Sequence, residues 1–156
     1  LRAMRAASPA LQEWWPDGGS PRSWGGVTWG DGGRVQELNL YGSKLEVLPP
    51  QIGQLTAVTT LFLRRCPLKE LPPEIGQLKA LTVLFLEGCP LKELPSEIGL
   101  LLALNWLDLE DCNQLTLAPG AKKGQPPQTI VAAYARLLIV ESRKDAPAQI
   151  LSAPTT

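Results

Sequence analysis

The sequence has no histidine among its 156 residues and no excess of charge, because 15 basic residues balance 15 acidic ones. Without histidine the chain lacks an imidazole base, a histidine-containing catalytic triad and a histidine-ligated metal site. Balanced charge provides no global field that would draw the chain to nucleic acid or anionic lipid. Apolar runs are interrupted by proline, glycine or charge well before the roughly 18 residues that a membrane span needs. We therefore expect no nucleic-acid partner and no membrane insertion.

Cysteine is also scarce, and its odd number and regular spacing match neither a disulfide framework nor a CxxC metal site. The three cysteines are Cys66, Cys89 and Cys112. We expect free thiols in a reducing compartment and predict a cytoplasmic location. Residues 1–12 carry Arg2 and Arg5 but no acid, which resembles the end of an organelle transit peptide, so organelle import is an alternative.

What the chain does contain is a unit of 23 residues that recurs, with copies beginning at Val35, Val58, Leu81 and Leu104. Within each copy the segment LxxLxL alternates apolar and variable residues, which is the period of a β-strand. A Ser or Cys, a leucine and then a Leu-Pro pair follow in the full copies, and the proline ends the strand. The next segment, IGxL, favours a short helical or 3₁₀ turn. Copies at constant spacing stack, so the repeat predicts a short curved solenoid with a parallel β-sheet on its concave face.

This pattern is that of leucine-rich repeats, and residues 35–117 resemble intracellular leucine-rich repeat proteins in which LPxxIGxLxxL follows each strand, including the Ras-group proteins of plants. The segment WGGVTWGDGGRVQELNL resembles the N-terminal cap of plant and algal leucine-rich repeat proteins. Trp29 stands where that cap has a cysteine, so the cap disulfide is absent. The segment LTLAPGAKKGQPPQTIVAAYARLL is similar to the closing stretch of the intracellular class. The resemblance implies a protein that binds other proteins, with no reaction and no cofactor.

A solenoid exposes its core at both ends unless a cap covers it. We predict an α/β leucine-rich repeat solenoid of about 3.5 repeats with a cap at each end. The N-terminal cap should contain a short helix at 9–15 and a β-hairpin that includes Val27 and Trp29. An amphipathic C-terminal helix could instead dock a partner or a membrane surface. The predicted segments are 1–34 as N-terminal cap, 35–119 as repeats, 120–143 as C-terminal capping helix and 144–156 as flexible tail.

The repeated leucines and the cysteine column are predicted to form the core, with each thiol beneath the loop backbone. The alternative is a thiol cluster that binds metal or senses redox state, but it lacks histidine or acidic companions arranged as ligands.

Strand residues that alternate with the leucines should point to the concave face. Phe62, Val83, Phe85 and Trp106 are expected there as one exposed apolar patch, and soluble monomers seldom expose neighbouring aromatics without use. Two alternatives stay open: the same residues pair only to stabilise the sheet, or a partner uses the Lys69-Glu70 and Lys92-Glu93 edge. The predicted partner-binding residues are Tyr41, Phe62, Arg64, Val83, Phe85, Glu87, Trp106, Asp108 and Glu110.

The sequence therefore favours a non-catalytic protein-protein interaction module or adaptor, with no metal and no cofactor. Catalysis is disfavoured further because no Gly-rich phosphate loop joins a strand to a helix. Two other functions remain compatible with the sequence: a structural or accessory subunit of a larger assembly, and a recognition fragment of a multidomain signalling protein. Neither the partner nor the oligomeric state follows from the sequence.

Overall fold

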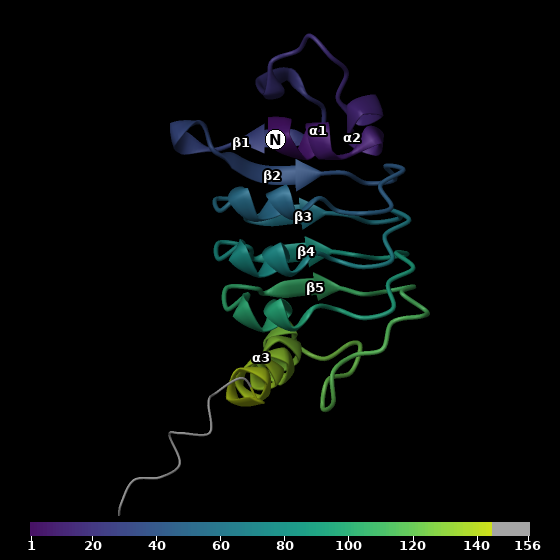
Figure 1. The fold of residues 1–156 in the computed structure, drawn as a ribbon, viewed down its shortest axis with the longest axis vertical. Helices are drawn as coiled ribbons and strands as arrows, with labels where there is room; N and C mark the ends of the chain where they lie inside the picture. Colours follow the sequence, from purple (N-terminus) through teal and green to yellow (C-terminus); the bar gives the residue numbers. More distant parts are fainter. Residues whose placement is uncertain (145–156) are drawn as a thin grey trace, which may run out of the picture.

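The structure is a computed structural model that describes residues 1–144, so all of the predicted tail except Lys144 lies outside the described residues. Its centre is a five-stranded sheet in the order β1-β2-β3-β4-β5, and the strands follow one another from the N-terminal cap to the C-terminal helix (Figure 1). The first two strands pair antiparallel and the others pair in parallel. The predicted hairpin and parallel sheet are both confirmed. The strands are β1 (Val27–Trp29), β2 (Val35–Asn39), β3 (Thr60–Phe62), β4 (Val83–Phe85) and β5 (Trp106–Asp108).

The register of the sheet follows the 23-residue period of the sequence, because paired residues on β2 to β5 are 23 positions apart. Leu38 lies opposite Leu61, Leu61 opposite Leu84, and Leu84 opposite Leu107. Because side chains alternate along a strand, this register points one leucine row into the core and turns the variable residues to the concave face. The central leucines of the first three repeats are fully buried, as the pattern predicts.

Each full repeat returns through a 3₁₀ segment, which confirms the interpretation of the IGxL motif. Proline precedes each segment in an extended conformation, and the isoleucine of the motif is fully buried. The glycine allows successive turns to stack closely. A Cβ on Gly76 would lie 2.7 Å from the backbone oxygen of Glu97, and one on Gly99 would lie 2.3 Å from the backbone nitrogen of Ala135. The segments are η3 (Pro50–Gln54), η4 (Pro73–Gln77) and η5 (Ser96–Leu100).

The cysteine column joins consecutive repeats by hydrogen bonds. The Cys89 thiol donates to the Leu63 carbonyl at 3.0 Å, and Cys66 and Cys112 donate at 3.1 Å to the equivalent carbonyls of Leu40 and Leu86. All three are free and buried. Burial raises the pKa of the Cys89 thiol to about 12, so it stays protonated and keeps its donor. The prediction that these residues belong to the core is confirmed.

The N-terminal cap is built around two tryptophans. The rings of Trp15 and Trp24 stack with centroids 5.0 Å apart, and Trp15 Nε1 donates to the Gly25 carbonyl at 2.9 Å. Ser8 caps the second helix, because its Oγ accepts from the Leu11 N–H at 3.4 Å. That helix confirms the predicted one, whereas the first helix was not predicted. The helical elements are α1 (Arg2–Ala7), α2 (Pro9–Trp14), η1 (Pro21–Ser23) and η2 (Asp31–Gly33).

The C-terminal helix α3 (Pro127–Lys144) packs against η5 and closes the last full repeat (Figure 1). It begins at Pro127, and residues 120–126, which the sequence assigned to the same segment, form turns and loop. Tyr134 anchors the helix, because its hydroxyl accepts from the Ala118 N–H at 3.2 Å. None of the described helices combines the length and the apolar character that crossing a bilayer requires.

Candidate protein-binding surface

The sheet register places those predicted site residues that lie on strands in columns on the concave face, and Tyr41, Arg64, Glu87 and Glu110 follow directly after the strands. Thr60, Val83 and Trp106 form one column, because each lies opposite the next across neighbouring strands. The adjacent column contains Asn39, Phe62, Phe85 and Asp108. The structure therefore brings together residues 23 positions apart in the sequence, as the repeat predicts.

The expected apolar patch is less open than the sequence suggested. The rings of Phe62 and Phe85 stack with centroids 4.8 Å apart, and the guanidinium carbon of Arg64 lies 4.2 Å from the centroid of the Phe85 ring. Both phenylalanines are consequently half-buried. Among the predicted site residues, the open aromatic side chains are instead Tyr41, which is 49% exposed, and Trp106, which is 58% exposed. The sequence could not separate these two groups, because a stacked ring and a free ring obey the same strand pattern.

Arg64 joins two neighbouring repeats by ion pairs. Its Nε lies 3.3 Å from a carboxylate oxygen of Glu87, and its Nη2 lies 2.5 Å from one of Asp108. Arg65 reaches Glu87 only at 3.9 Å. These contacts are the ones expected if the residues stabilise the sheet. Together they form a rigid floor on the concave face, made of Phe62, Arg64, Phe85, Glu87 and Asp108.

Asp108 has a second role in the backbone turn after β5. Its Oδ1 accepts from the Glu110 N–H at 3.1 Å, and Asn39 accepts in the same way from the Tyr41 N–H at 3.0 Å. Side chains of this kind bond their own backbone two residues on and so define a turn. Glu110 and its neighbour Asp111 are exposed, and within residues 1–144 neither carboxylate forms an ion pair.

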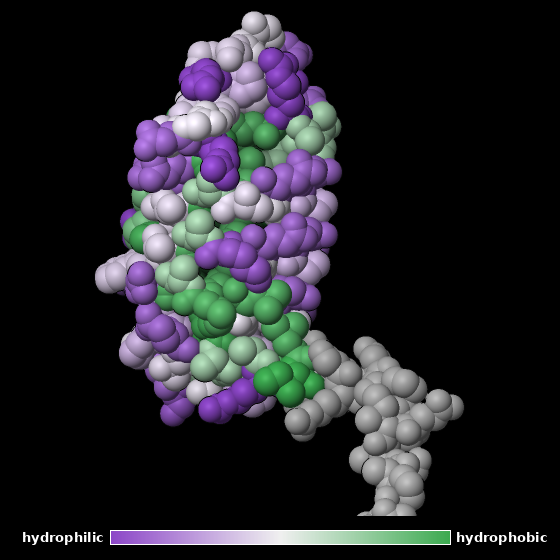
Figure 2. Space-filling model, turned by 90° about the vertical axis from the view of Figure 1, so that its left-hand side faces the viewer, coloured by the Kyte–Doolittle hydropathy of each residue, from purple (hydrophilic) through white to green (hydrophobic). Residues whose placement is uncertain are grey.

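A group of exposed apolar residues near the C-terminal end was missed in the sequence. Figure 2 shows hydrophobic residues gathered toward this end of the face that it presents. Leu100 is 39% exposed, Leu102 82% and Ile139 55%. The signal was present in the repeat, because the third full copy has Leu100 and Leu102 where the earlier copies have polar residues, as QLTA and QLKA become LLLA.

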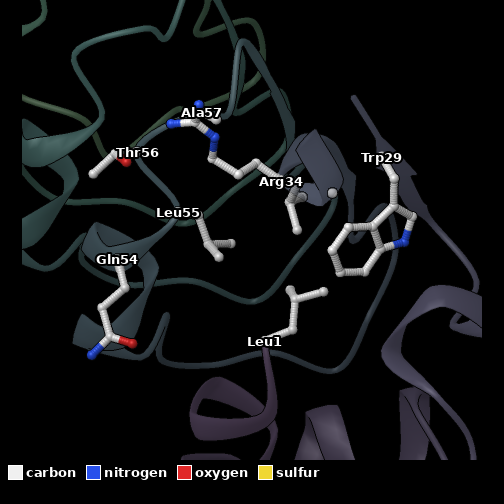
Figure 3. A pocket seen from close by; sticks show the side chains of 9 residues that line it. Leu1, Trp29, Arg34, Gln54, Leu55, Thr56 and Ala57 are labelled. Atoms are coloured by element: carbon white, nitrogen blue, oxygen red, sulfur yellow. The ribbon is translucent and has the colours of Figure 1, made fainter. Parts of the chain in front are cut away.

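The described residues form several surface clefts, with volumes between about 90 and 580 Å³. One beside the N-terminal cap has a volume of about 200 Å³ and is lined in part by Trp29, Arg34 and Leu55. The Arg34 side chain reaches across it toward Ala57 (Figure 3). Small-molecule pockets typically measure about 300–1,000 Å³. Among the described residues, no group of three or more cysteine or acidic side chains is arranged to hold a metal ion.

Comparison with known proteins gives matches only among solved structures, since no protein-family model and no curated protein matches the sequence. The chain is similar to a plant ice-binding protein, with 26% identity and a TM-score of 0.57 over 68% of this chain and 37% of that one. It is similar to PEPR1-AtPEP1, with 23% identity and a TM-score of 0.51 over 63% of this chain and 16% of that one. The leucine-rich repeat protein LIC12759 of Leptospira interrogans is 38% identical, with a TM-score of 0.48 over 55% of this chain and 25% of that one.

The repeat, the sheet and the structural likeness together show that the chain has the fold of a short leucine-rich repeat solenoid. It spans 16–37% of the length of these similar chains.

Proposed function

We propose that this chain is a non-catalytic protein-binding module whose concave face recognises a protein partner. The observation that carries the proposal is the pair of open aromatic side chains, Trp106 on β5 and Tyr41 in the turn after β2, beside a sheet whose phenylalanines are stacked. Aromatic residues are the usual anchors of protein interfaces. Solenoids of this type use their concave surfaces for binding.

The predicted site residues divide into two roles under this proposal. Phe62, Arg64, Phe85, Glu87 and Asp108 form the rigid floor, because their stacking and ion pairs hold their side chains in place. A floor already ordered loses little conformational entropy when a partner binds. The exposed residues that reach the partner are Tyr41, Trp106 and Glu110, and the half-buried Val83 lies beside Trp106 on the neighbouring strand.

The absence of catalysis is part of the same proposal. The chain has no histidine, and its thiols are buried and hydrogen-bonded to carbonyls. Burial raises the pKa of each thiol, to about 12 at Cys89, whereas a reactive cysteine needs a lowered pKa and access. Glu87 and Asp108 are engaged with Arg64. These features support binding rather than a reaction.

The test begins with a partner identified by cross-linking mass spectrometry from native material, whose affinity for the purified chain is then measured by calorimetry. Trp106→Ala should weaken binding by at least about 10-fold, since truncating a central aromatic anchor costs about 2 kcal/mol or more and about 1.4 kcal/mol is tenfold. Val47→Ala is the matched control, because Val47 is also 58% exposed but follows the strand of the first repeat on another surface. Unchanged affinity in both Trp106→Ala and Tyr41→Ala would refute the proposed site.

The mass of the native complex distinguishes the adaptor from the other two functions. A low-mass species in size-exclusion chromatography supports an adaptor, and a stable large complex supports a structural or accessory subunit. A full-length gene product with further domains would support the signalling fragment. We also propose a cytoplasmic location, in agreement with the free thiols and testable by fractionation.

A further inference from the structure

The sheet is held together by a ladder of main-chain hydrogen bonds that repeats at every step. The Leu63 N–H donates to the Phe85 carbonyl at 2.9 Å, and the Arg65 N–H donates to the Glu87 carbonyl at 2.8 Å. One repeat later the same two positions donate again, from Leu86 to Asp108 and from Gly88 to Glu110, both at 2.9 Å. At these two positions, main-chain N–H groups of one repeat donate hydrogen bonds to carbonyls of the next repeat.

The ladder ends without a partner at β5. The positions that would donate next are Leu109 and Asp111, and within residues 1–144 neither N–H has an acceptor. The Asn105 carbonyl likewise receives no donor from the described residues, whereas the equivalent Thr82 carbonyl accepts from the N–H groups of Asn105 and Trp106. An unpaired strand edge of this kind is a template for pairing with another chain.

The C-terminal segment covers only the two ends of this edge. Gln128 Nε2 donates to the Leu104 carbonyl at 3.3 Å at one end, and Lys123 Nζ donates to the Cys112 carbonyl at the other. Between them lies a groove of about 390 Å³. Its lining includes Leu107, Leu109, Glu110, Asp111, Lys123 and Ile130. A groove beside free main-chain donors suits an extended peptide, because main-chain bonds provide affinity and the groove accepts alternate side chains.

The charge of the edge indicates the chemistry of the occupant. Glu110 and Asp111 are exposed and form no ion pair among the described residues, and Lys123 is the basic residue that lines the groove. A second copy of β5 that paired antiparallel through the amides of Leu109 and Asp111 would bring Glu110 opposite its own counterpart, and like charges directly opposite each other destabilise a sheet. A basic segment meets an opposite charge at the same positions.

We propose that an extended, basic segment of the protein partner adds to the free edge of β5 as a further strand, accepting hydrogen bonds from the N–H groups of Leu109 and Asp111. This inference rests on the proposed binding function and specifies how the partner engages the surface. One row of its side chains would continue the concave face beside Trp106, and the other would enter the groove beside Ile130.

The experiment uses the full chain, labelled with ¹⁵N, and a capped peptide of alternating lysine and valine. About seven residues match the stretch from Asn105 to Asp111. We expect the peptide to shift the amide signals of Leu109 and Asp111 and to slow their hydrogen exchange at least about 10-fold at saturation. A peptide with proline at its central position and a peptide with glutamate in place of lysine should each bind at least about 10-fold more weakly.

A variant pair tests the charge without disturbing the backbone. The double variant Glu110→Gln/Asp111→Asn should weaken the lysine peptide several-fold, and Asn tolerates the positive φ of 56° at position 111. Glu70→Gln/Glu93→Gln is the matched control, because both acids are exposed on the Lys-Glu edge, and it should leave the affinity unchanged.

Three results would overturn the inference. The first is the absence of any change at Leu109 and Asp111, and the second is equal binding of the proline peptide, which would mean charge attraction alone. The third is a dimer in sedimentation velocity with these two amides already protected, which would assign the edge to a second copy. The edge site and the proposed function can also fail separately. If the peptide binds the edge of β5 but Trp106→Ala and Tyr41→Ala both leave the affinity for the natural partner unchanged, the proposed function is refuted and the edge site is not. If these variants weaken binding of the natural partner but the peptide changes neither amide, only the edge site is refuted.

Discussion

The two ends of the solenoid are closed by different elements. At the N-terminal end β1 pairs with β2, so a strand covers the edge of the sheet while Trp15 and Trp24 cover the core. At the C-terminal end α3 packs on η5 and covers the core, but within the described residues no strand covers β5. Burying apolar side chains and satisfying main-chain groups are therefore separate requirements. Residues 1–144 meet both at the N-terminal end, but at the C-terminal end they meet only the first.

The largest loss of stability is expected from a variant that disrupts the N-terminal cap. Trp15→Ala removes a fully buried ring, its stacking on Trp24 and its hydrogen bond to Gly25. We expect a loss of about 3–5 kcal/mol in the free energy of unfolding, as for large-to-small changes in cores. Urea unfolding followed by circular dichroism measures it. The neighbouring Trp14 is 40% exposed, so Trp14→Ala should cost less than about 1 kcal/mol. Equal losses in the two variants would contradict the role of the stack.

The next largest loss of stability is expected from a variant that disrupts the packing of α3 on η5 at the C-terminal end. A Cβ added by Gly99→Ala would lie 2.3 Å from the Ala135 backbone nitrogen, so α3 must move away from η5. Overpacking of this kind costs about 1–3 kcal/mol, and hydrogen exchange should speed up in α3 while the N-terminal cap stays protected. Gly25→Ala is the control, since a Cβ at Gly25 would meet no atom within 4 Å and its φ is not positive. Uniform loss of protection along the chain would show that the two ends are not independent.

The cysteine column between the ends should respond to pH. The pKa of Cys89 is raised to about 12 from an ordinary value of 9.0, so the folded state holds the proton more tightly than the unfolded state. Its contribution to stability is complete below pH 9.0 and is lost as the pH rises toward about 12. We expect Cys89 to contribute a loss on the order of 1 kcal/mol between pH 8 and 10. Cys89→Ser keeps a donor without this titration, so its stability should fall less over the same range. Parallel curves for the two proteins would exclude the thiol as the cause.

The smallest effect concerns the floor of the concave face. Arg64→Ala removes ion pairs to Glu87 and Asp108 and the contact with Phe85. Because the Arg64 side chain is 33% exposed, solvent screens these pairs, and we expect a loss of about 0.5–1 kcal/mol. Arg65→Ala, which removes only the 3.9 Å contact, should cost less. Thermal unfolding of both variants decides this, and a larger loss in Arg65→Ala would reverse the assignment.

Much of the fold could be predicted because one pattern recurs. The strands, the 3₁₀ turns and the thiol column repeat with the sequence period, and stacking of equal units leaves the register no freedom. The short helix at Pro9–Trp14 followed from Ser8 and Pro9, a capping signal that acts within a few residues. The helix α1 carries no such signal, since its preceding residue makes no side-chain cap bond.

The candidate site was predictable in position but not in exposure. The columns that contain Phe62 and Trp106 follow from strand alternation. Whether a ring is covered depends on its neighbours, and Arg64 covers the Phe85 ring while bonding Asp108, a residue 44 positions away. Side-chain contacts over such a distance are not encoded by a local period.

The sequence by itself determined the repeat, the core and the face on which variable residues lie, because hydrophobic periodicity and constant spacing act locally and add up. Only the tertiary structure decided which variable residues are open, which charges pair and which edge of the sheet stays free. Those outcomes depend on where the chain passes after the repeat fades. The loop after Leu117 carries the chain to α3 without laying a strand beside β5, and so within residues 1–144 the N–H groups of Leu109 and Asp111 have no acceptor.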